Sequence, residues 1–372
     1  MVECVIHGQV VDPSGYSEHA RSVIFGLYQI GVDIELSSLS CFTSTLNSLP
    51  QEYQEVLKEI SKAKVSPKAP KICITTPEFY APEKDRYNIG FTAWETDRLP
   101  KPWLPYMQSM DEIWSPSTFC TEVYKKDLTK PVYTIGEGVD TQLFNPYVEP
   151  AKIVNKKKFT FFSMFQWTWR KAPDVLLKAY ASEFTSSDDV CLLLRVYGSN
   201  ESAEEHARLK KEIKNYVESV SSEPPLILYV SKYVPHINLP RLICACDCGV
   251  FPSRGEGFNR PALETMACGR PVIVTNWSGH LDFVTDRTGF LVDLDCFSQV
   301  SNMSHIPWYT PDMKWAEPCV KSLREKMRYA YEHQAEVKEK GKKARWEAVT
   351  KWDNVVVAKR IKERLEEISK SV

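Results

Sequence analysis

The chain has 372 residues, 43% hydrophobic and 26% charged, which is ordinary for a globular protein. This length favours two domains of about 150 to 200 residues, each able to bury its own core. A net charge of −1 gives no global field for nucleic acid or an anionic membrane. No apolar run approaches the ~20 residues that span a bilayer. We therefore expect no nucleic-acid partner and no transmembrane segment, while peripheral membrane contact stays open.

The N-terminus and the cysteines indicate the compartment. Residues 1–6 lack a basic region and a long apolar core, so a first strand is expected there rather than a signal peptide. Eleven cysteines without a disulfide-rich spacing fit reduced thiols. Cys244, Cys246 and Cys248 alternate, but they have no CxxC pair or histidine at ligand spacing, so buried thiols are favoured over zinc. A cytoplasmic protein is predicted.

Strand and helix patterns alternate along the first part of the chain. Apolar runs predict strands and helical spacing of apolar residues predicts helices. The expected order is strand 2–11, helix 17–30, strand 32–39, helix 51–64, strands 71–76 and 87–94, helix 103–111, strand 112–115, helix 117–127 and strand 132–135. Such alternation is typical of a parallel sheet covered by helices.

Two residues of this first part are candidates for a ligand site. Gly15 lies in the turn between the first strand and helix, where a glycine lets the backbone approach a ligand, although a plain tight turn fits equally well. Glu95 follows strand 87–94, at the edge where open α/β folds bind ligands. A helix N-cap or a surface salt bridge is the alternative for Glu95.

The same alternation follows a lysine-rich connector at 145–158. The expected order is strand 159–165, helix 174–184, strand 190–197, helix 201–220, strand 226–230, helix 239–245, strand 248–251, helix 262–268, strands 271–275 and 290–292, and charged helices 318–335 and 336–369, the last with a break near 352. Asp293 and Asp295 form an Asp-x-Asp triplet, for which we favour a solvated loop over a metal site.

The loop at 252–259 is the most informative stretch. It leads from a buried strand into a helix, with Asn259 suited to the N-cap as a hydrogen-bond acceptor. Free amides and the positive end of that helix then favour a phosphate. Glu256 and Glu264 frame this position and suit paired hydroxyls, so the combination predicts a sugar nucleotide. A solvated loop residue and a helix-dipole partner are the alternatives for the two glutamates.

Arg170 and Lys171 add positive charge at a strand end. They lie between strand 159–165 and helix 174–184, where two cations suit a diphosphate clamp. Plain surface charge is the alternative for both.

The spacing of Glu256 and Glu264, eight residues apart and continued by residues 266–273, resembles the paired-glutamate motif of the retaining glycosyltransferases of family 4. Gly138, Val139 and Asp140, with a phenylalanine and a proline shortly after, resemble the segment where the chain of that family leaves its first domain. The resemblance runs over nearly the whole chain and is sharpest between residues 159 and 293.

This resemblance implies the GT-B fold, with two Rossmann-like doubly wound parallel-sheet domains facing a cleft. The acceptor-side domain is expected at 1–150, joined by a C-terminal helix at 346–372, and the nucleotide-sugar domain at 158–345. The implied reaction moves a hexose from a nucleotide diphosphate sugar to the hydroxyl of a glycan or other acceptor, with retention. No metal or cofactor is implied.

The resemblance also implies roles for individual residues. Lys171, Arg170 and the helix start near Asn259 would stabilise the leaving diphosphate, Glu256 would hold the sugar hydroxyls, and Glu264 the ribose. Further implied donor contacts are Gly257, Phe258, Gly15, Tyr233 and Val234, the last two beside the nucleotide base.

Two departures from the family pattern affect these roles. Gln166 stands where the family has an arginine, so Arg170 would replace that charge. Glu95 follows Trp94 near the place of a family histidine, which makes Glu95 the expected acceptor-side catalytic residue. Alternatives to a transferase are a GT-B epimerase or phosphorylase and a noncatalytic sugar-nucleotide-binding protein.

Overall fold

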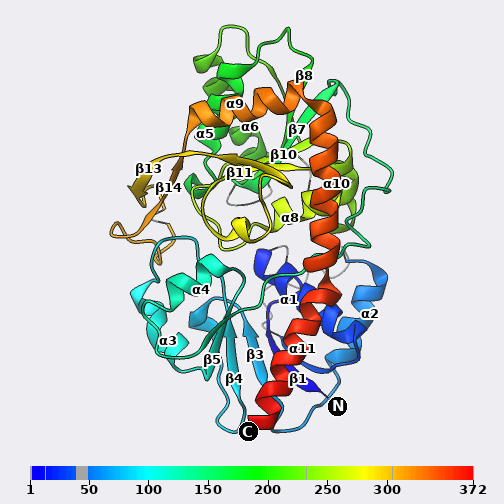
Figure 1. Ribbon diagram of the computed structural model, residues 1–372, viewed down its shortest axis with the longest axis vertical. Coiled ribbons are helices and arrows are strands. Elements are labelled where there is room, and N and C mark those ends of the chain that lie inside the picture. The colour runs from blue at the N-terminus through cyan, green and yellow to red at the C-terminus, as the bar shows by residue number, and fades with distance from the viewer. Residues whose placement is uncertain are drawn as a thin grey trace. The chain divides into compact units, whose positions relative to one another are not determined.

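The computed structural model describes residues 2–371 except 13, 39–48, 199, 201, 232 and 304. The chain divides into two compact units. Unit 1 contains Met1–Thr141, Pro235–Ile237 and Val349–Val372, and unit 2 contains Gln142–Val234 and Asn238–Ala348. The chain therefore begins in unit 1, builds unit 2, and returns to unit 1 for its last helix (Figure 1).

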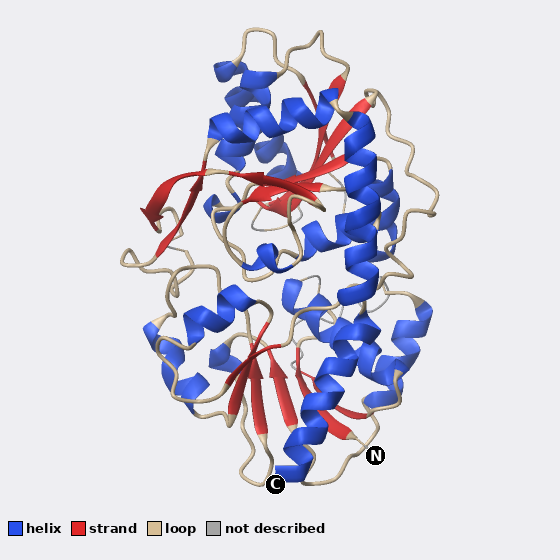
Figure 2. Cartoon of the chain, in the orientation of Figure 1, coloured by secondary structure: helices blue, strands red, loops and turns tan. Residues whose placement is uncertain are grey.

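Unit 1 is built on a six-stranded sheet in the order β2-β1-β3-β4-β5-β6, and every neighbouring pair is parallel. Its strands are β1 (Glu3–Gly8), β2 (Asp33–Ser38), β3 (Lys71–Ile74), β4 (Asn88–Phe91), β5 (Glu112–Ser115) and β6 (Val132–Thr134). Its helices are α1 (Gly15–Gln29), α2 (Gln51–Ile60), η2 (Pro77–Phe79), η3 (Lys101–Trp103), α3 (Leu104–Gln108), α4 (Thr118–Tyr124) and α11 (Asn354–Ser371). The helices cover the sheet in Figure 2.

Helix α11 packs closely on α1 although the two are far apart in sequence. Gly26 makes this possible, because a Cβ there would lie 2.4 Å from the backbone oxygen of Asn354. Trp352, just before α11, is also buried and lies against Gly136. These contacts fasten the C-terminal helix to the core of unit 1.

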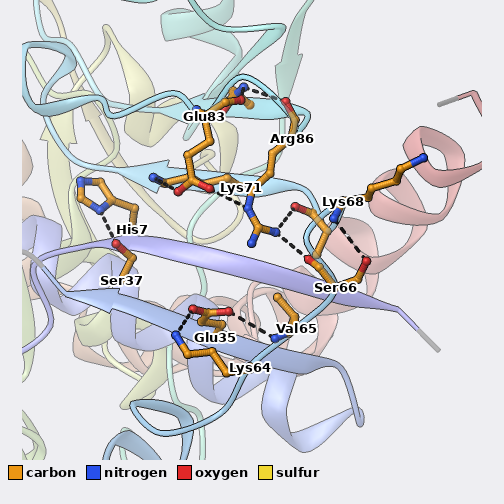
Figure 3. A network of polar contacts seen from close by, with 12 residues as sticks. His7, Glu35, Ser37, Lys64, Val65, Ser66, Lys68, Lys71, Glu83 and Arg86 are labelled. Carbon is orange, nitrogen blue, oxygen red and sulfur yellow. Dashed lines mark hydrogen bonds and ion pairs between the residues drawn. The ribbon is translucent and has the colours of Figure 1, made fainter.

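A polar network closes the end of the sheet where β3 begins (Figure 3). Lys71, the first residue of β3, is buried, and its Nζ donates to Glu83 at 2.7 Å. Arg86 donates to the same carboxylate at 2.8 Å and to the carbonyl oxygens of Ser66 and Ala69. Because a buried ammonium needs a partner, Glu83 lets the chain start β3 with a lysine.

Unit 2 is built on a second six-stranded parallel sheet, in the order β12-β11-β10-β7-β8-β9. Its strands are β7 (Phe159–Gln166), β8 (Val190–Tyr197), β9 (Leu226–Tyr229), β10 (Cys248–Phe251), β11 (Val272–Thr275) and β12 (Gly289–Val292). Its helical elements are η4 (Trp169–Lys171), α5 (Pro173–Glu183), α6 (Ala203–Val220), α7 (Leu239–Cys244), α8 (Arg260–Ala267), η6 (Gly279–Asp282), α9 (Val320–Glu332) and α10 (Gln334–Lys351).

These two sheets confirm the predicted fold class of two parallel α/β layers covered by helices. Their central strands are apolar because helices bury both faces. The break near 352 is confirmed as well, since α10 ends at Lys351 and α11 begins at Asn354.

The prediction of a loop at Asp295 was wrong. Asp295 lies in β13 (Leu294–Gln299), which pairs antiparallel with β14 (Lys314–Pro318) in a two-stranded ribbon. Most of β13 is exposed, so it carries no alternation of buried and exposed side chains that would reveal a strand. None of the described helices has the length and hydropathy needed to cross a membrane.

Candidate active site

The candidate site centres on the loop between β10 and α8 in unit 2. Ser253, Arg254 and Glu256 are all buried in this loop. The amide of Glu256 donates to the Ser278 hydroxyl at 3.0 Å, and its carbonyl accepts from the amide of Gly279 at 3.0 Å. The loop is therefore tied to the segment after β11, at the carboxyl edge of the sheet where α/β folds bind ligands.

Two cations hold the carboxylate of Glu256. Lys171 Nζ lies 2.6 Å from Oε1, and Arg170 Nη1 lies 2.9 Å from Oε2. The Ser253 hydroxyl also donates to Oε1 at 2.6 Å. Burial alone would raise the pKa of Glu256, but the charges of Lys171 and Arg170 and these hydrogen bonds outweigh it and lower the pKa to about 2. Glu256 is thus an anion at any physiological pH.

The turn after β7 presents both cations. Ala172 ends η4 in a left-handed conformation at φ 51° and starts α5, so the chain reverses immediately after Lys171. The carbonyl of Arg170 accepts from the amide of Arg254 at 2.7 Å. Arg170 Nη1 also donates to the carbonyl of Gly255 at 2.8 Å. The predicted residues Glu256, Lys171 and Arg170 therefore form one cluster.

Arg254 forms a second cluster that sequence reasoning missed. Its guanidinium donates to both carboxylate oxygens of Asp174 at 2.9 Å and to Glu317 on β14 at 2.8 Å. It also lies 4.1 Å from the ring centre of Trp169 and donates to the carbonyl of that residue. Arg254 thereby fastens η4, α5 and β14 to the loop that carries Glu256.

Asn259 stands at the N-cap of α8, but the predicted capping was wrong. Its side chain makes no capping hydrogen bond, because the residue adopts a left-handed conformation at φ 82°. Its Nδ2 is buried and has no hydrogen-bond partner. Asparagine tolerates this conformation better than most residues. The residue therefore shapes the loop through its backbone and leaves one amide donor for a ligand.

The neighbouring predicted residues have different surroundings. Phe258 is buried and its ring lies 5.0 Å from that of Phe283, so only its backbone, like that of Gly257, suits a donor contact. Glu264 lies in the second turn of α8, buried, with its carboxylate 3.9 Å from Arg260. The loop and the first turns of α8 thus bring both motif glutamates to one region.

His280 is a second residue that the sequence did not reveal. Its Nε2 donates to the carbonyl of Thr275 at 2.5 Å, whose hydroxyl in turn donates to the carbonyl of Ser253. Burial lowers the pKa of His280, which leaves the ring neutral and Nδ1 as an acceptor. Nδ1 is buried without a hydrogen-bond partner. A lone histidine after a strand is not a recognisable pattern, so the sequence did not predict that His280 lies in the candidate site.

Tyr233 and Val234 follow β9, at the same carboxyl edge of the sheet. Tyr233 is exposed and Val234 is half-buried. Strand β9 lies three strands from β10 in the sheet, a separation of about 14 Å at the usual spacing. Both residues thus follow a strand remote from β10, and their contact with a nucleotide base stays a prediction.

Gly15 and Glu95 belong to unit 1. Gly15 is the first residue of α1, is exposed, and has open space where a Cβ would stand, so nothing described requires a glycine there. Glu95 is half-buried in the loop after β4, and in the same loop the Thr92 hydroxyl pairs with that of Tyr16 at 2.8 Å. The N-cap alternative for Glu95 was wrong, because the next helical element begins at Lys101.

Among the residues that the structure describes, no group of three or more histidine, cysteine, aspartate or glutamate side chains is arranged to hold a metal ion.

Solved structures with the same architecture define the class. Sucrose-phosphate synthase from Thermosynechococcus elongatus matches with a TM-score of 0.67 at 14% identity, covering 100% of both chains. Anabaena HepE in complex with UDP-glucose matches with a TM-score of 0.65 at 15% identity, covering 99% of this chain and 100% of that one. The trehalose-6-phosphate synthase OtsA matches with a TM-score of 0.69 at 10% identity over 98% and 99% of the two chains. The chain has the GT-B fold.

Sequence comparison finds similarity to glycosyltransferases over part of unit 2. Residues 156–301 match the model described as Glycosyl transferases group 1. A D-inositol 3-phosphate glycosyltransferase of Arthrobacter sp. is 30% identical over 164 residues, 42% of this chain and 37% of that protein. The O-antigen chain mannosyltransferase B of Escherichia coli is 38% identical over 85 residues, 23% of this chain and 22% of that protein. The segment 156–301 is therefore similar to the glycosyl transferases group 1, and membership of family 4 stays a prediction.

The chain aligns with less than two fifths of the length of these curated relatives. The aligned family segment contains the whole β10–α8 loop together with Lys171 and Arg170. The comparison therefore concerns the part of unit 2 that holds the candidate site.

Proposed function

We propose that the protein is a retaining glycosyltransferase that moves a hexose from a nucleotide diphosphate sugar to the hydroxyl of a glycan or other acceptor. The observation that carries this proposal is the cluster of Lys171 and Arg170 on Glu256, beside the start of α8. The names of the curated relatives, all glycosyltransferases or a sugar-phosphate synthase, support it. The UDP-glucose bound to HepE supports a nucleotide-sugar donor.

The cations would act on the leaving group. Breaking the bond between the sugar and the diphosphate leaves negative charge on the diphosphate and positive charge on the sugar ring. Lys171 and Arg170 lie together in the protein, so both would stabilise that charge once the diphosphate is bound. The start of α8 and the Nδ2 of Asn259 would add donors. Side chains thereby supply the positive charge that a divalent cation supplies elsewhere.

The two motif glutamates would bind rather than react. Glu256 would accept hydrogen bonds from the sugar hydroxyls, and Glu264 from the ribose. A carboxyl group with a pKa near 2 is a weak general base at neutral pH. We therefore propose a front-face substitution in which the leaving phosphate takes the proton of the acceptor hydroxyl, which retains the configuration. Glu95 of unit 1 is proposed on the acceptor side, and Tyr233 and Val234 beside the base.

The test is a donor screen followed by turnover. UDP, GDP and ADP sugars are screened by thermal shift, since a ligand that binds the folded state raises the melting temperature. Release of nucleoside diphosphate is then measured with an acceptor panel, for wild type, Lys171→Ala and Lys178→Ala. Lys178 is the matched control, because it is an exposed lysine of α5 outside the cluster.

We expect one sugar nucleotide to bind, and Lys171→Ala to lose about 100-fold or more in turnover while Lys178→Ala keeps wild-type turnover. The anomeric configuration of the product should match that of the donor. Absence of binding by any sugar nucleotide would reject the proposal. Binding without turnover on any acceptor would favour the noncatalytic alternative, and turnover without transfer to an acceptor would favour an epimerase.

A further inference from the structure

The carboxylate of Glu256 occupies the cations that the proposed reaction needs. Lys171 contacts one of its oxygens at 2.6 Å and Arg170 contacts the other at 2.9 Å. The two oxygens thus receive two cations, which is also how a diphosphate would engage this pair. In the protein without ligand, the anion at this place belongs to the chain itself.

We infer that Glu256 is an internal substitute for the diphosphate, and that it makes the site bind a nucleotide diphosphate sugar in preference to the nucleoside diphosphate product. This inference rests on the proposed function and deepens it. It assigns Glu256 a specificity role in addition to its contact with the sugar hydroxyls.

The geometry requires the cations, and not the carboxylate, to move. Glu256 is 4% exposed, its carboxylate accepts from Ser253, and its backbone is bonded to Ser278 and Gly279. Lys171 and Arg170 have long side chains that are 15% and 16% exposed. A diphosphate therefore draws the cations away from a carboxylate that stays behind.

A carboxylate left behind in a buried place needs new partners. Removing the partner of a buried charge is strongly unfavourable, and a nearby phosphate adds repulsion between like charges. The hydroxyls of a bound sugar replace the lost hydrogen bonds, because each one donates to the carboxylate. A nucleoside diphosphate has no hydroxyl there. Its binding therefore separates Glu256 from the cations and gives the carboxylate no new hydrogen bonds.

The consequence is discrimination between donor and product. Before transfer, the sugar satisfies Glu256 and the diphosphate takes the cations. After transfer, the sugar leaves with the acceptor, and Glu256 competes with the diphosphate for Lys171 and Arg170. The carboxylate then helps to expel the product.

The test compares nucleoside diphosphates with their sugar derivatives by titration calorimetry. The probes are UDP, GDP and ADP, each beside UDP-glucose, GDP-mannose or ADP-glucose, on wild type and Glu256→Gln. The control is Glu317→Gln, which removes a carboxylate that pairs with Arg254 instead of the two cations. Glu256→Asp is the second variant, since it keeps the charge but withdraws it from the cations by about one methylene.

We expect Glu256→Gln to bind the matching nucleoside diphosphate roughly tenfold tighter than wild type does. The preference of wild type for the sugar derivative should shrink in this variant, Glu256→Asp should be intermediate, and Glu317→Gln should keep the wild-type preference.

Two outcomes would overturn the inference in distinguishable ways. If wild type binds a sugar nucleotide but the Gln and Asp variants bind the free diphosphate no tighter, the donor site stands and the specificity role of Glu256 fails. If neither wild type nor any variant binds any of the six nucleotides, the proposed function fails and the inference falls with it.

Discussion

Two charge clusters meet in one loop, and their compositions are opposite. Arg254 is a single cation shared by the two carboxylates of Asp174 and Glu317. Glu256, two residues later, is a single carboxylate shared by Lys171 and Arg170. The first cluster leaves negative charge in excess on the side of α5 and β14, and the second leaves positive charge in excess. Only the second therefore suits an anionic ligand.

The two clusters have different roles although Arg254 and Glu256 are only two residues apart. The Arg254 cluster connects η4, α5 and β14, and the ring of Trp169 covers its guanidinium. The Glu256 cluster connects the loop with the same turn, but through cations that a ligand can also bind. We expect substitutions in the first cluster to affect stability and substitutions in the second to affect binding and turnover.

The largest expected effect is the loss of activity when Lys171 is replaced, a loss that distinguishes Lys171 from Arg254. Lys171→Met should lower kcat/KM by about 100-fold to 1000-fold, because it removes a preorganised charge from the leaving group. Its unfolding free energy should fall by less than that of Arg254→Met, since Arg170 still pairs with Glu256. Nucleoside diphosphate release and urea unfolding measure the two quantities. Loss of stability with unchanged turnover per folded molecule would erase the distinction between the clusters.

The converse substitution is Arg254→Met. It should lower the unfolding free energy by about 3 kcal/mol, because Asp174 and Glu317 lose their shared partner. The value lies at the low end for buried pairs, since both carboxylates are about a quarter exposed. Urea unfolding at neutral pH measures it, with Lys178→Met as an exposed control. A stable Arg254→Met protein with lost donor affinity would instead place Arg254 in the binding site.

The pH dependence of stability tests the Glu256 cluster alone. The folded-state pKa of Glu256 is about 2, below its ordinary value of 4.5, so the cluster contributes its full stability above pH 4.5. That contribution, about 3 kcal/mol for such a shift, is lost as the pH falls from 4.5 toward 2. Wild type should therefore lose stability relative to Glu256→Gln in this range. If the difference in unfolding free energy between wild type and Glu256→Gln stays constant throughout this range, the pKa of Glu256 is not lowered by its two cations.

The smallest expected effect concerns the end of the same loop. Asn259 has a left-handed backbone at φ 82°, which glycine adopts freely and alanine does not. Asn259→Ala should cost about 1 to 2 kcal/mol of unfolding free energy, and Asn259→Gly less than about 0.5 kcal/mol. Thermal unfolding of the two variants measures this difference. Equal stability of both would mean that the backbone relaxes when the side chain is removed.

Much of the fold was predictable because parallel strands buried on both faces are continuous apolar runs. The ribbon β13–β14 was not, since its side chains are mostly exposed and it contributes little to a core. The capping role of Asn259 was expected from residue type, and the left-handed backbone that prevents it depends on the whole loop.

The residues of the candidate site were predictable one by one, but their pairing was not. Glu256 and Lys171 were expected to bind sugar and diphosphate respectively, yet they bind each other across 85 positions of sequence. The partners of Arg254 lie 80 and 63 positions away, so no local pattern indicates that the side chain is buried. Contacts of this kind follow from the order of strands in the sheet.

The return of the chain to unit 1 sets an order of assembly during synthesis. Apart from Pro235–Ile237, unit 2 is continuous from residue 142 to 348, so all of it leaves the ribosome before α11 is made. The surface of α1 around Gly26 lacks its partner for that whole period, because Asn354 is added more than 300 residues later. Unit 2, with the entire Glu256 cluster, can therefore fold first, and unit 1 is the part of the nascent protein that depends longest on protection from aggregation.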